Sequence, residues 1–431
     1  MVFHRFDRQL FAALESAEGT AETIAVGDYI EVLEDVTYTV TPMEFERNHV
    51  RPSYAKIPMY RPSEGLTSSD QTMSMVEFTF TVEMTGHTAG ATTTAPSWEV
   101  LLQSCGFEKV NTLKYDSMSA ISSGPLFHRE RVDGTSSEST AISTHFTTDS
   151  RFYYIGTDPD TTSITGQASS AVATVGGSGA AAGIGYALNT RKSYGNSSSC
   201  TIELNMEDRT SGVTGRRLVA RGCRGNVVFA FTATDRVLMT FTMTGVLHSI
   251  TNSDGRTTVN YNHALPPMFT SAGLEIMESS GSTDFTAALF ETISLDVGNE
   301  VTYRADANSA DGYKAAIITD RTPTISMNPD AIVGGTTSAT VFDFFQKWLQ
   351  GTPTRAAWEV GDGLDGNSFH FKAPAVQWTG VADGDRDGFA IYDCSGNLTG
   401  GDFGDSVPSA GGTTNLYSDK GSDNELVILH T

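Results

Sequence analysis

The sequence predicts a mainly β protein whose two halves are related to each other. Three observations carry this prediction. Thr, Ser and Gly are abundant and charged residues make up only 18% of the chain, which favours strands and turns over helices. Several segments alternate apolar and polar residues, as half-buried strands do. One succession of elements also occurs twice along the 431 residues, and a long repeat with two copies favours two fused domains over a solenoid.

Each copy of the repeat reads as a strand, a polar loop, a second strand and a short helix. The first copy comprises residues 36–47, a loop through Tyr54, 75–84 and 96–106. The second comprises 290–304, a loop through Tyr313, 318–328 and 340–351. We therefore expect two tandem β-sandwich or barrel domains, each with a flanking short α-helix and a long hairpin.

The N-terminal segment has apolar residues at helical spacing. Phe6, Leu10, Phe11 and Leu14 precede Gly19, so residues 5–17 form either a short helix or an arm that docks elsewhere. The segment 75–84 is a clearer strand. Its apolar face is Val76, Phe78, Phe80 and Val82, and its polar face is Glu77, Thr79, Thr81 and Glu83.

The two expected helices end at glycines. In 96–105 an apolar stripe of Trp98, Leu101, Leu102 and Cys105 precedes Gly106, a residue suited to a left-handed helix cap. The later helix carries Val341, Phe344, Phe345, Trp348 and Leu349 before Gly351. Both stripes are expected to be core faces that lie on a sheet.

The expected domain organisation follows from these elements. An N-terminal arm spans 1–22 and a first domain 23–263, with an insertion at 119–199 whose Ser/Thr/Gly-rich composition differs from the rest. A linker with two prolines spans 264–282, and a second domain spans 283–431. We expect the insertion to lie on the outside of the assembly.

Charge and composition narrow the functional classes. The formal net charge of −23 argues against a protein that binds nucleic acid or an anionic membrane through basic patches. The four cysteines are scattered and are expected to be reduced, buried thiols of a cytosolic product. No run of apolar residues is long enough for a membrane span, and residues 1–14 lack the core of a signal peptide.

No catalytic, cofactor-binding or metal-binding motif stands out, so we expect no enzyme, no cofactor and no metal. The sharpest match is Asp383-Gly384-Asp385-Arg386-Asp387-Gly388, which resembles the first half of an EF-hand loop. Position twelve of that loop, where a bidentate Glu belongs, is Cys394. An acidic β-turn between two strands explains the segment better.

Several motifs, in their order and spacing, resemble the tail tube protein of a long-tailed, siphophage-like bacteriophage. They are Leu10-Phe11-Ala12-Ala13-Leu14-Glu15-Ser16 before Gly19-Thr20, then Glu46-Arg47-Asn48-His49-Val50-Arg51-Pro52, the helix at 96–107, Arg221-Gly222-Cys223-Arg224-Gly225-Asn226-Val227, residues 295–304, and Thr319-Asp320-Arg321-Thr322-Pro323. The resemblance covers most of the chain outside 119–199.

The resemblance implies a structural virion protein. Long hairpins of neighbouring subunits would join into a closed inter-subunit β-barrel channel, and stacked rings would form a tube that carries double-stranded DNA into the host. With two domains per chain, three chains would give a pseudo-sixfold ring, which we expect over a hexamer. The implied partners are further copies of the chain, the tape measure, tail terminator and distal tail proteins, and double-stranded DNA in transit without specific binding. Assembly would take place in the host cytoplasm, with no membrane partner.

The alternating strands supply candidates for the surface that lines such a channel. These lumen-facing candidates are Glu77, Thr79, Thr81 and Glu83 in the first domain and Thr292, Ser294 and Asp296 in the second. Carboxylates repel phosphates and hydroxyls stay hydrated, so DNA would pass without sticking. Two alternatives remain open: another β-rich virion component, such as a baseplate, capsid-decoration or adhesion module, or an enzyme such as a glycan hydrolase, although no carboxylate pair is singled out by its spacing.

Overall fold

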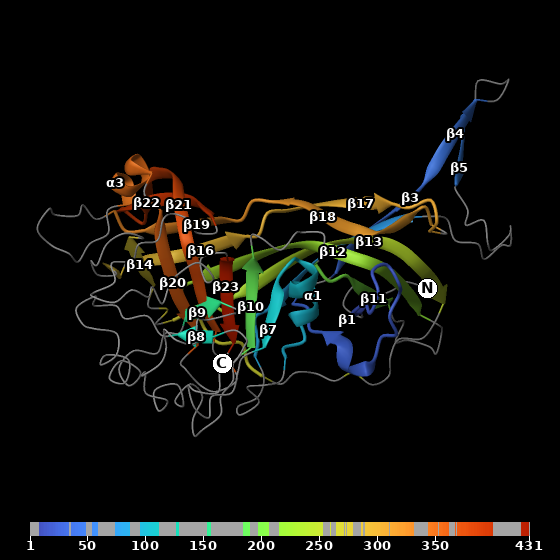
Figure 1. The fold of residues 1–431 in the computed structure, drawn as a ribbon, viewed down its shortest axis with the longest axis horizontal. Helices are drawn as coiled ribbons and strands as arrows, with labels where there is room; N and C mark the ends of the chain where they lie inside the picture. The colour runs from blue at the N-terminus through green and yellow to red at the C-terminus, as the bar shows by residue number, and fades with distance from the viewer. Residues whose placement is uncertain are drawn as a thin grey trace, which may run out of the picture.

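The protein is mainly β, with antiparallel strands and two short α-helices in the part of the chain that the structure describes (Figure 1). The structure is a computed structural model. It describes residues 8–33, 36–48, 54–58, 74–86, 95–111, 126–128, 153–156, 184–189, 197–206, 215–252, 259, 264–270, 272, 274–278, 286–287, 289–309, 311–331, 344–351, 353–361, 367, 369–399 and 424–430.

In the first half of the chain, before residue 264, the strands are β1 (Arg8–Leu14), β2 (Tyr29–Ile30), β3 (Thr37–Pro42), β4 (Glu44–Asn48), β5 (Tyr54–Pro58), β6 (Ser74–Glu83), β7 (Glu108–Asn111), β8 (Leu126–His128), β9 (Tyr153–Gly156), β10 (Ile184–Asn189), β11 (Cys200–Met206), β12 (Arg216–Thr232) and β13 (Leu238–Asn252). The helices are η1 (Val26–Asp28) and α1 (Glu99–Ser104).

In the second half the strands are β14 (Glu275–Glu278), β15 (Thr286–Ala287), β16 (Phe290–Asp296), β17 (Asn299–Ala305), β18 (Tyr313–Arg321), β19 (Thr324–Pro329), β20 (Thr354–Val360), β21 (Phe369–Arg386), β22 (Phe389–Leu398) and β23 (Asn424–His430), with helix α3 (Phe344–Gln350).

One 17-stranded sheet contains most of these strands and includes both halves of the chain. Its main run is β3–β6–β13–β12–β16–β19–β22–β21, and β11, β1 and β2 continue from the first part of β12. The first part of β21 instead pairs with β20 and β23, which lead to β14 and to β10 and β7. Within the described residues the sheet is open, so a single chain does not form a closed barrel.

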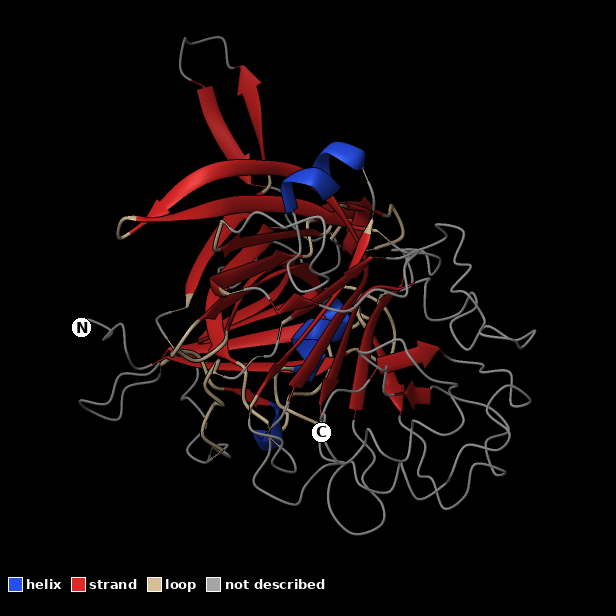
Figure 2. Cartoon of the chain, turned by 90° about the vertical axis from the view of Figure 1, so that its left-hand side faces the viewer, coloured by secondary structure: helices blue, strands red, loops and turns tan. Residues whose placement is uncertain are grey.

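The β20, β21 and β23 region folds over the main run, and the strands of the two layers cross one another in Figures 1 and 2. Aromatic rings fill the space between them. Phe231 of β12 meets Phe371 of β21 with ring centroids 4.9 Å apart, and Trp358 of β20 stacks on Phe371 at 5.4 Å. Phe229 and Trp98 continue the same core. Such edge-to-face and stacked pairs add about 0.5–1.5 kcal/mol each beyond area burial.

The helix ends agree with the sequence, but one helix face does not. Gly106 (φ 97°) and Gly351 (φ 63°) both adopt the left-handed conformation after their helices. The α1 stripe is fully buried, which confirms the expected core face. The prediction for α3 is wrong in part: Phe344 is buried, whereas Phe345 and Leu349 are 44% and 67% exposed. Only one side of α3 lies on β21, where Phe344 packs against Trp378 and Trp348 Nε1 donates to the Thr379 carbonyl oxygen.

The predicted N-terminal arm, insertion and linker each contribute a strand to the large sheet. Residues 8–14 are strand β1 between β11 and β2, so the helical interpretation of this segment is wrong. Within the predicted insertion, β10 pairs with both β7 and β23 and buries Tyr186 and Leu188. Within the predicted linker, β14 pairs with β20 and buries Ile276.

The four cysteines are free and buried, as the sequence predicts. Within the described residues, no helix is long and apolar enough to cross a membrane.

Candidate functional site: the hydroxyl face and the junction of the two halves

All seven lumen-facing candidates lie on one face of the main sheet. Residues directly opposite each other in antiparallel strands point to the same side. One such row runs across six strands, through Thr81, Thr240, Val228, Asp296, Thr324 and Asn397. The Oγ1 atoms of Thr81 and Thr240 are 3.2 Å apart. Because side chains alternate along each strand, the other six candidates share this face with Asp296.

Hydroxyl side chains dominate this surface, which we call the hydroxyl face. Its polar members on the described strands include Thr37, Thr39, Thr41, Glu77, Thr79, Thr81, Glu83, Asn226, Thr232, Thr240, Thr242, Thr244, Thr292, Ser294, Asp296, Thr324, Ser326, Ser395 and Asn397. Met75, Val228, Ala230 and Leu238 also lie on this face, and so does Arg224, which lies opposite Thr244 and donates to the Ala316 carbonyl oxygen of β18. Glu77 is exposed, whereas the other six lumen-facing candidates are half-buried. Glu83 also forms an ion pair with Arg236, at 2.6 Å. The opposite face of the same strands supplies the apolar core.

The two halves of the chain meet in this sheet, where β12 pairs with β16. Val228 to Thr232 of β12 lie opposite Asp296 to Thr292 of β16. Beside this ladder, Asn226 Nδ2 donates to Asp296 Oδ1 at 2.7 Å. Asn299 Nδ2, at the start of β17, donates to the Cys105 carbonyl oxygen after α1 (2.7 Å) and to the Gly225 carbonyl oxygen (2.9 Å). Hence the second half covers the end of α1 in the first.

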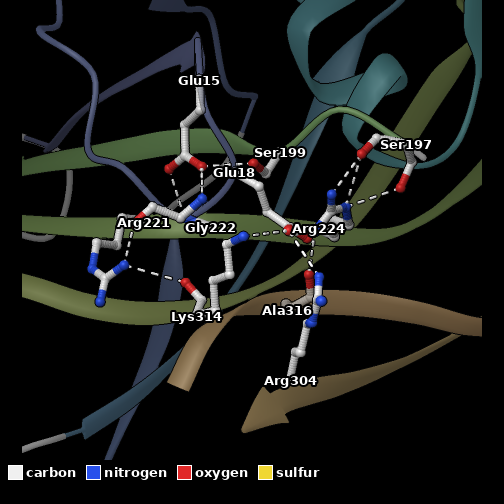
Figure 3. Close-up of polar contacts among 11 residues, drawn as sticks. Glu15, Glu18, Ser197, Ser199, Arg221, Gly222, Arg224, Arg304, Lys314 and Ala316 are labelled. Carbon is white, nitrogen blue, oxygen red and sulfur yellow. Dashed lines mark hydrogen bonds and ion pairs between the residues drawn. The ribbon is translucent and has the colours of Figure 1, made fainter. Parts of the chain in front are cut away.

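Two arginines of β12 hold the hairpin β17–β18 against the first half (Figure 3). Arg221 donates to the carbonyl oxygens of Gly19 and Lys314 and forms an ion pair with Asp311. Arg224, whose side chain is 3% exposed, forms an ion pair with Glu18 at 3.0 Å.

Further donors and acceptors complete the network around Arg224 and Glu18. Arg224 donates to the carbonyl oxygens of Ala316 and Ser197. Glu18 also forms ion pairs with two residues of the hairpin, Arg304 at 3.1 Å and Lys314 at 3.4 Å. Guanidinium groups suit this position because their five donors can bind several carbonyl oxygens at fixed angles.

Glu15 anchors the loop that carries Glu18. Its carboxylate accepts from the backbone N–H groups of Gly19 (2.7 Å) and Gly222 (2.6 Å) and from the hydroxyls of Ser199 and Thr201. Gly222 has φ 61°, and a Cβ there would lie 2.7 Å from Ala315 Cα of the hairpin. This glycine is therefore required by both its backbone conformation and the close approach of β18.

The pKa of Glu18 reflects competing environments. Partial burial opposes its ionisation, but the Arg224 guanidinium and hydrogen bonds from Arg224 and Lys314 outweigh burial and lower the pKa. Glu425 behaves in the opposite way. Its burial raises the pKa more than its ion pair with Arg321 lowers it.

The acidic segment that resembles an EF-hand is a two-residue hairpin turn. Arg386 at the end of β21 pairs with Phe389 at the start of β22, and Asp387 and Gly388 between them have φ values of 52° and 88°. This agrees with the expected β-turn. Within the described residues, no group of three or more His, Cys, Asp or Glu side chains is placed to hold a metal ion.

Sequence reasoning did not identify the arginine network at the junction. The motif at 221–227 contributed only to the family resemblance, although two arginines separated by glycine and cysteine in a strand signal an interruption of the ladder. Comparison with known proteins adds no neighbour, since no family model and no curated protein matches the chain.

Proposed function

We propose that this chain is a phage tail tube protein. Copies would polymerise as stacked rings around a channel for double-stranded DNA, and three chains would supply six similar units to each ring. In this proposal each chain contributes two tandem tube domains, and the main sheets of neighbouring chains join into the inter-subunit barrel. The chain would reside in the virion tail, where the tape measure, tail terminator and distal tail proteins would be its partners.

One observation carries the proposal: the face of the sheet that carries these Thr and Ser side chains continues from one half of the chain to the other across the β12–β16 junction, where Val228, Ala230 and Thr232 of β12 lie opposite Asp296, Ser294 and Thr292 of β16. A channel wall for DNA needs a wide surface of short, hydrated side chains without clustered cations. Apart from the area under the hairpin β17–β18, where Arg224, Arg304 and Lys314 surround Glu18, the hydroxyl face offers Thr and Ser side chains with Glu77 and Asp296 among them. The net charge of −23 also opposes phosphate binding. The open edges of the sheet also favour association with further copies of the chain, because exposed edge strands tend to pair with other strands.

Electron microscopy of the purified protein tests the proposal directly. Hollow tubes or rings, with projections along the axis that show six similar units, are expected. Monomers, or trimeric spikes without a channel, would favour the alternative of a baseplate, capsid-decoration or adhesion module.

A charge reversal at Glu77 tests the channel surface. Glu77→Lys is a cleaner change than Glu83→Lys, because Glu83 already pairs with Arg236. We expect tubes of normal appearance but slower DNA passage at low salt, since one lysine per chain repeats along the whole tube. The difference should shrink as salt rises above about 0.1 M, where screening acts within about 10 Å. Equal ejection rates for the Glu77 variant and the wild type at low salt would contradict this placement of the hydroxyl face.

A further inference from the structure

Two sets of four strands in this chain pair in the same way. In the first half β3 pairs with β6, β6 with β13 and β13 with β12; in the second, β16 pairs with β19, β19 with β22 and β22 with β21. The registers also agree. Val40 lies opposite Val76, which lies opposite Gly245, and Leu295 lies opposite Ile325, which lies opposite Gly396.

A shared irregularity fixes the equivalence of β12 and β21. Each strand has a bulge between its two ladders, Arg221 to Arg224 in β12 and Trp378 to Gly380 in β21. Each bulge lies beside the equivalent glycine of the partner strand. A Cβ on Gly245 would lie 3.1 Å from the Arg221 carbonyl oxygen, and a Cβ on Gly396 would lie 3.1 Å from the Gln377 carbonyl oxygen. Gln377 is therefore equivalent to Arg221, and Arg386 to Ala230.

The first set has its outer edge covered and the second does not. β12 pairs through Val228 to Thr232 with β16, and the hairpin β17–β18 lies across β12 and β13. In β21 the residues equivalent to Val228 to Ala230 are 384–386, and they pair only with β22 among the described strands. Beside it, α3 exposes Phe345 and Leu349, whereas the end of the corresponding helix α1 is covered by Asn299.

The strands that would cover this edge are present at the other end of the molecule. β3 is equivalent to β16, and among the described strands it pairs only with β6. The hairpin β4–β5 follows β3 as β17–β18 follows β16, and it projects away from the body in Figure 1, at the end opposite α3. An isolated two-stranded hairpin is marginally stable in water, so β4–β5 needs a surface to lie on.

We propose that the β3 edge of one chain pairs with residues 384–386 of β21 in a second copy, in the register of the internal junction. Thr41 would lie opposite Gly384, Val40 opposite Asp385 and Thr39 opposite Arg386, while β4–β5 would lie on the α3 side of the neighbour. The contact is head-to-tail, so the copies form a closed ring only if the rotation from one copy to the next is a whole fraction of a full turn. A ring of three chains rests on the proposed function, whereas the junction rests on the equivalence of the strand pairs.

The internal β12–β16 junction and the proposed contact between chains would differ in the side chains that lie beside the paired strands. Where the internal junction has Val227 and Phe229 in the core, β21 has exposed Asp383 and Asp385. The part of the contact between chains around Asp383 and Asp385 is therefore solvated. The apolar surface of the contact comes from Val40 and from the exposed face of α3.

Engineered thiols test the register. Residues directly opposite in antiparallel strands have Cβ atoms about 4.5–5.5 Å apart, a distance that a disulfide can span after a small adjustment. Thr39→Cys and Arg386→Cys are single variants that are purified separately, mixed and oxidised with oxidised glutathione. We expect a covalent dimer from the mixture and none from either variant alone. The matched control mixes Thr39→Cys with Ala382→Cys, which lies on the same face but four residues away, about 13 Å along the strand.

The double variant and electron microscopy separate this inference from the proposed function. Thr39→Cys/Arg386→Cys in one chain should give covalent species that end at three chains. Rings of wild-type protein without cross-linking in the mixture would overturn the register but leave the tube intact as a proposal. A specific dimer from a protein that never forms rings or tubes would retain the junction and refute the tube. Circular dichroism shows whether each cysteine variant folds. If one does not, hydrogen exchange of the wild-type protein tests the junction instead. The β3 amides must become protected on self-association, and unchanged exchange overturns the junction.

Discussion

Replacing Arg224 with alanine should weaken the attachment of the β17–β18 hairpin and destabilise the whole chain. The side chain is 3% exposed and donates to the Ala316 and Ser197 carbonyl oxygens as well as to Glu18. Removing one partner of a buried ion pair costs about 3–5 kcal/mol. Glu18 keeps Lys314 and Arg304 nearby, so its carboxylate is not left without cations. We therefore expect the lower end of that range, about 3 kcal/mol.

Urea unfolding followed by tryptophan fluorescence measures this cost. With an m-value of about 3 kcal/mol/M, a loss of about 3 kcal/mol moves the midpoint by about 1 M. Arg236→Ala is the matched control, because its ion pair with Glu83 is at the surface, with Arg236 44% exposed. Such pairs contribute about 0–1 kcal/mol. Equal midpoint shifts for the two variants would refute the assignment of Arg224 as an anchor.

The pH dependence of the same measurement isolates the Glu18 contribution. The folded-state pKa of Glu18 is lowered below 4.5, so the folded chain binds fewer protons than the unfolded chain in that region. The resulting stability is present above about pH 4.5 and is lost as the pH falls through the folded pKa. Arg224→Ala removes the largest cause that lowers this pKa, so the variant should lose less additional stability than the wild type on acidification. An unchanged pH slope would show that Arg224 does not act on Glu18.

Three further substitutions or measurements test the rest of the fold. Gly245→Ala should destabilise the chain by about 1–3 kcal/mol, because its Cβ would overlap Cys223 Sγ, whereas Gly27→Ala has open space and should be near neutral in urea unfolding. Tyr186→Phe removes the hydroxyl that donates to Glu99 Oε2 at 2.8 Å and should cost about 1–3 kcal/mol, while Tyr186→Ala should cost about 3–5 kcal/mol if β10 is a core strand. Burial, and then the Asp393 carboxylate, raise the pKa of the Cys394 thiol to about 12, so this thiol should not react with Ellman's reagent at pH 8 until the protein unfolds.

Local patterns in the sequence predicted the elements whose burial is one-sided. β6 alternates buried and accessible residues along its length, and its sequence alternates in the same way. The glycines after α1 and α3 also identified the helix ends, because a left-handed residue there is a local requirement. These features depend only on residues that are close in sequence, so the amino-acid sequence alone is enough to predict them.

Features that depend on distant partners were missed. Leu10 and Phe11 are both fully buried although they point to opposite sides of β1, one into the main core and the other into a small cluster with Ile24. A strand buried on both faces does not alternate, and its apolar residues happened to match helical spacing. β10 was missed for a related reason: its partner β23 lies more than two hundred residues later in the chain.

In the proposed pairing between chains, the internal junction and the contact between copies would differ in strength. Inside one chain, Arg221 forms an ion pair with Asp311 in the loop between β17 and β18, and Arg224 donates to the Ala316 carbonyl oxygen of β18. At the equivalent positions of β21 stand Gln377 and Gly380, which offer no cation. A junction within a chain must hold from the moment of folding, together with the β12–β16 ladder, the β10–β23 pairing and the shared aromatic core. A junction between chains must instead form only when other copies are abundant, and an attachment without buried guanidinium groups would make that association concentration-dependent rather than permanent. In the proposed assembly, the difference between these two pairs of residues would let the chain fold first and associate afterwards.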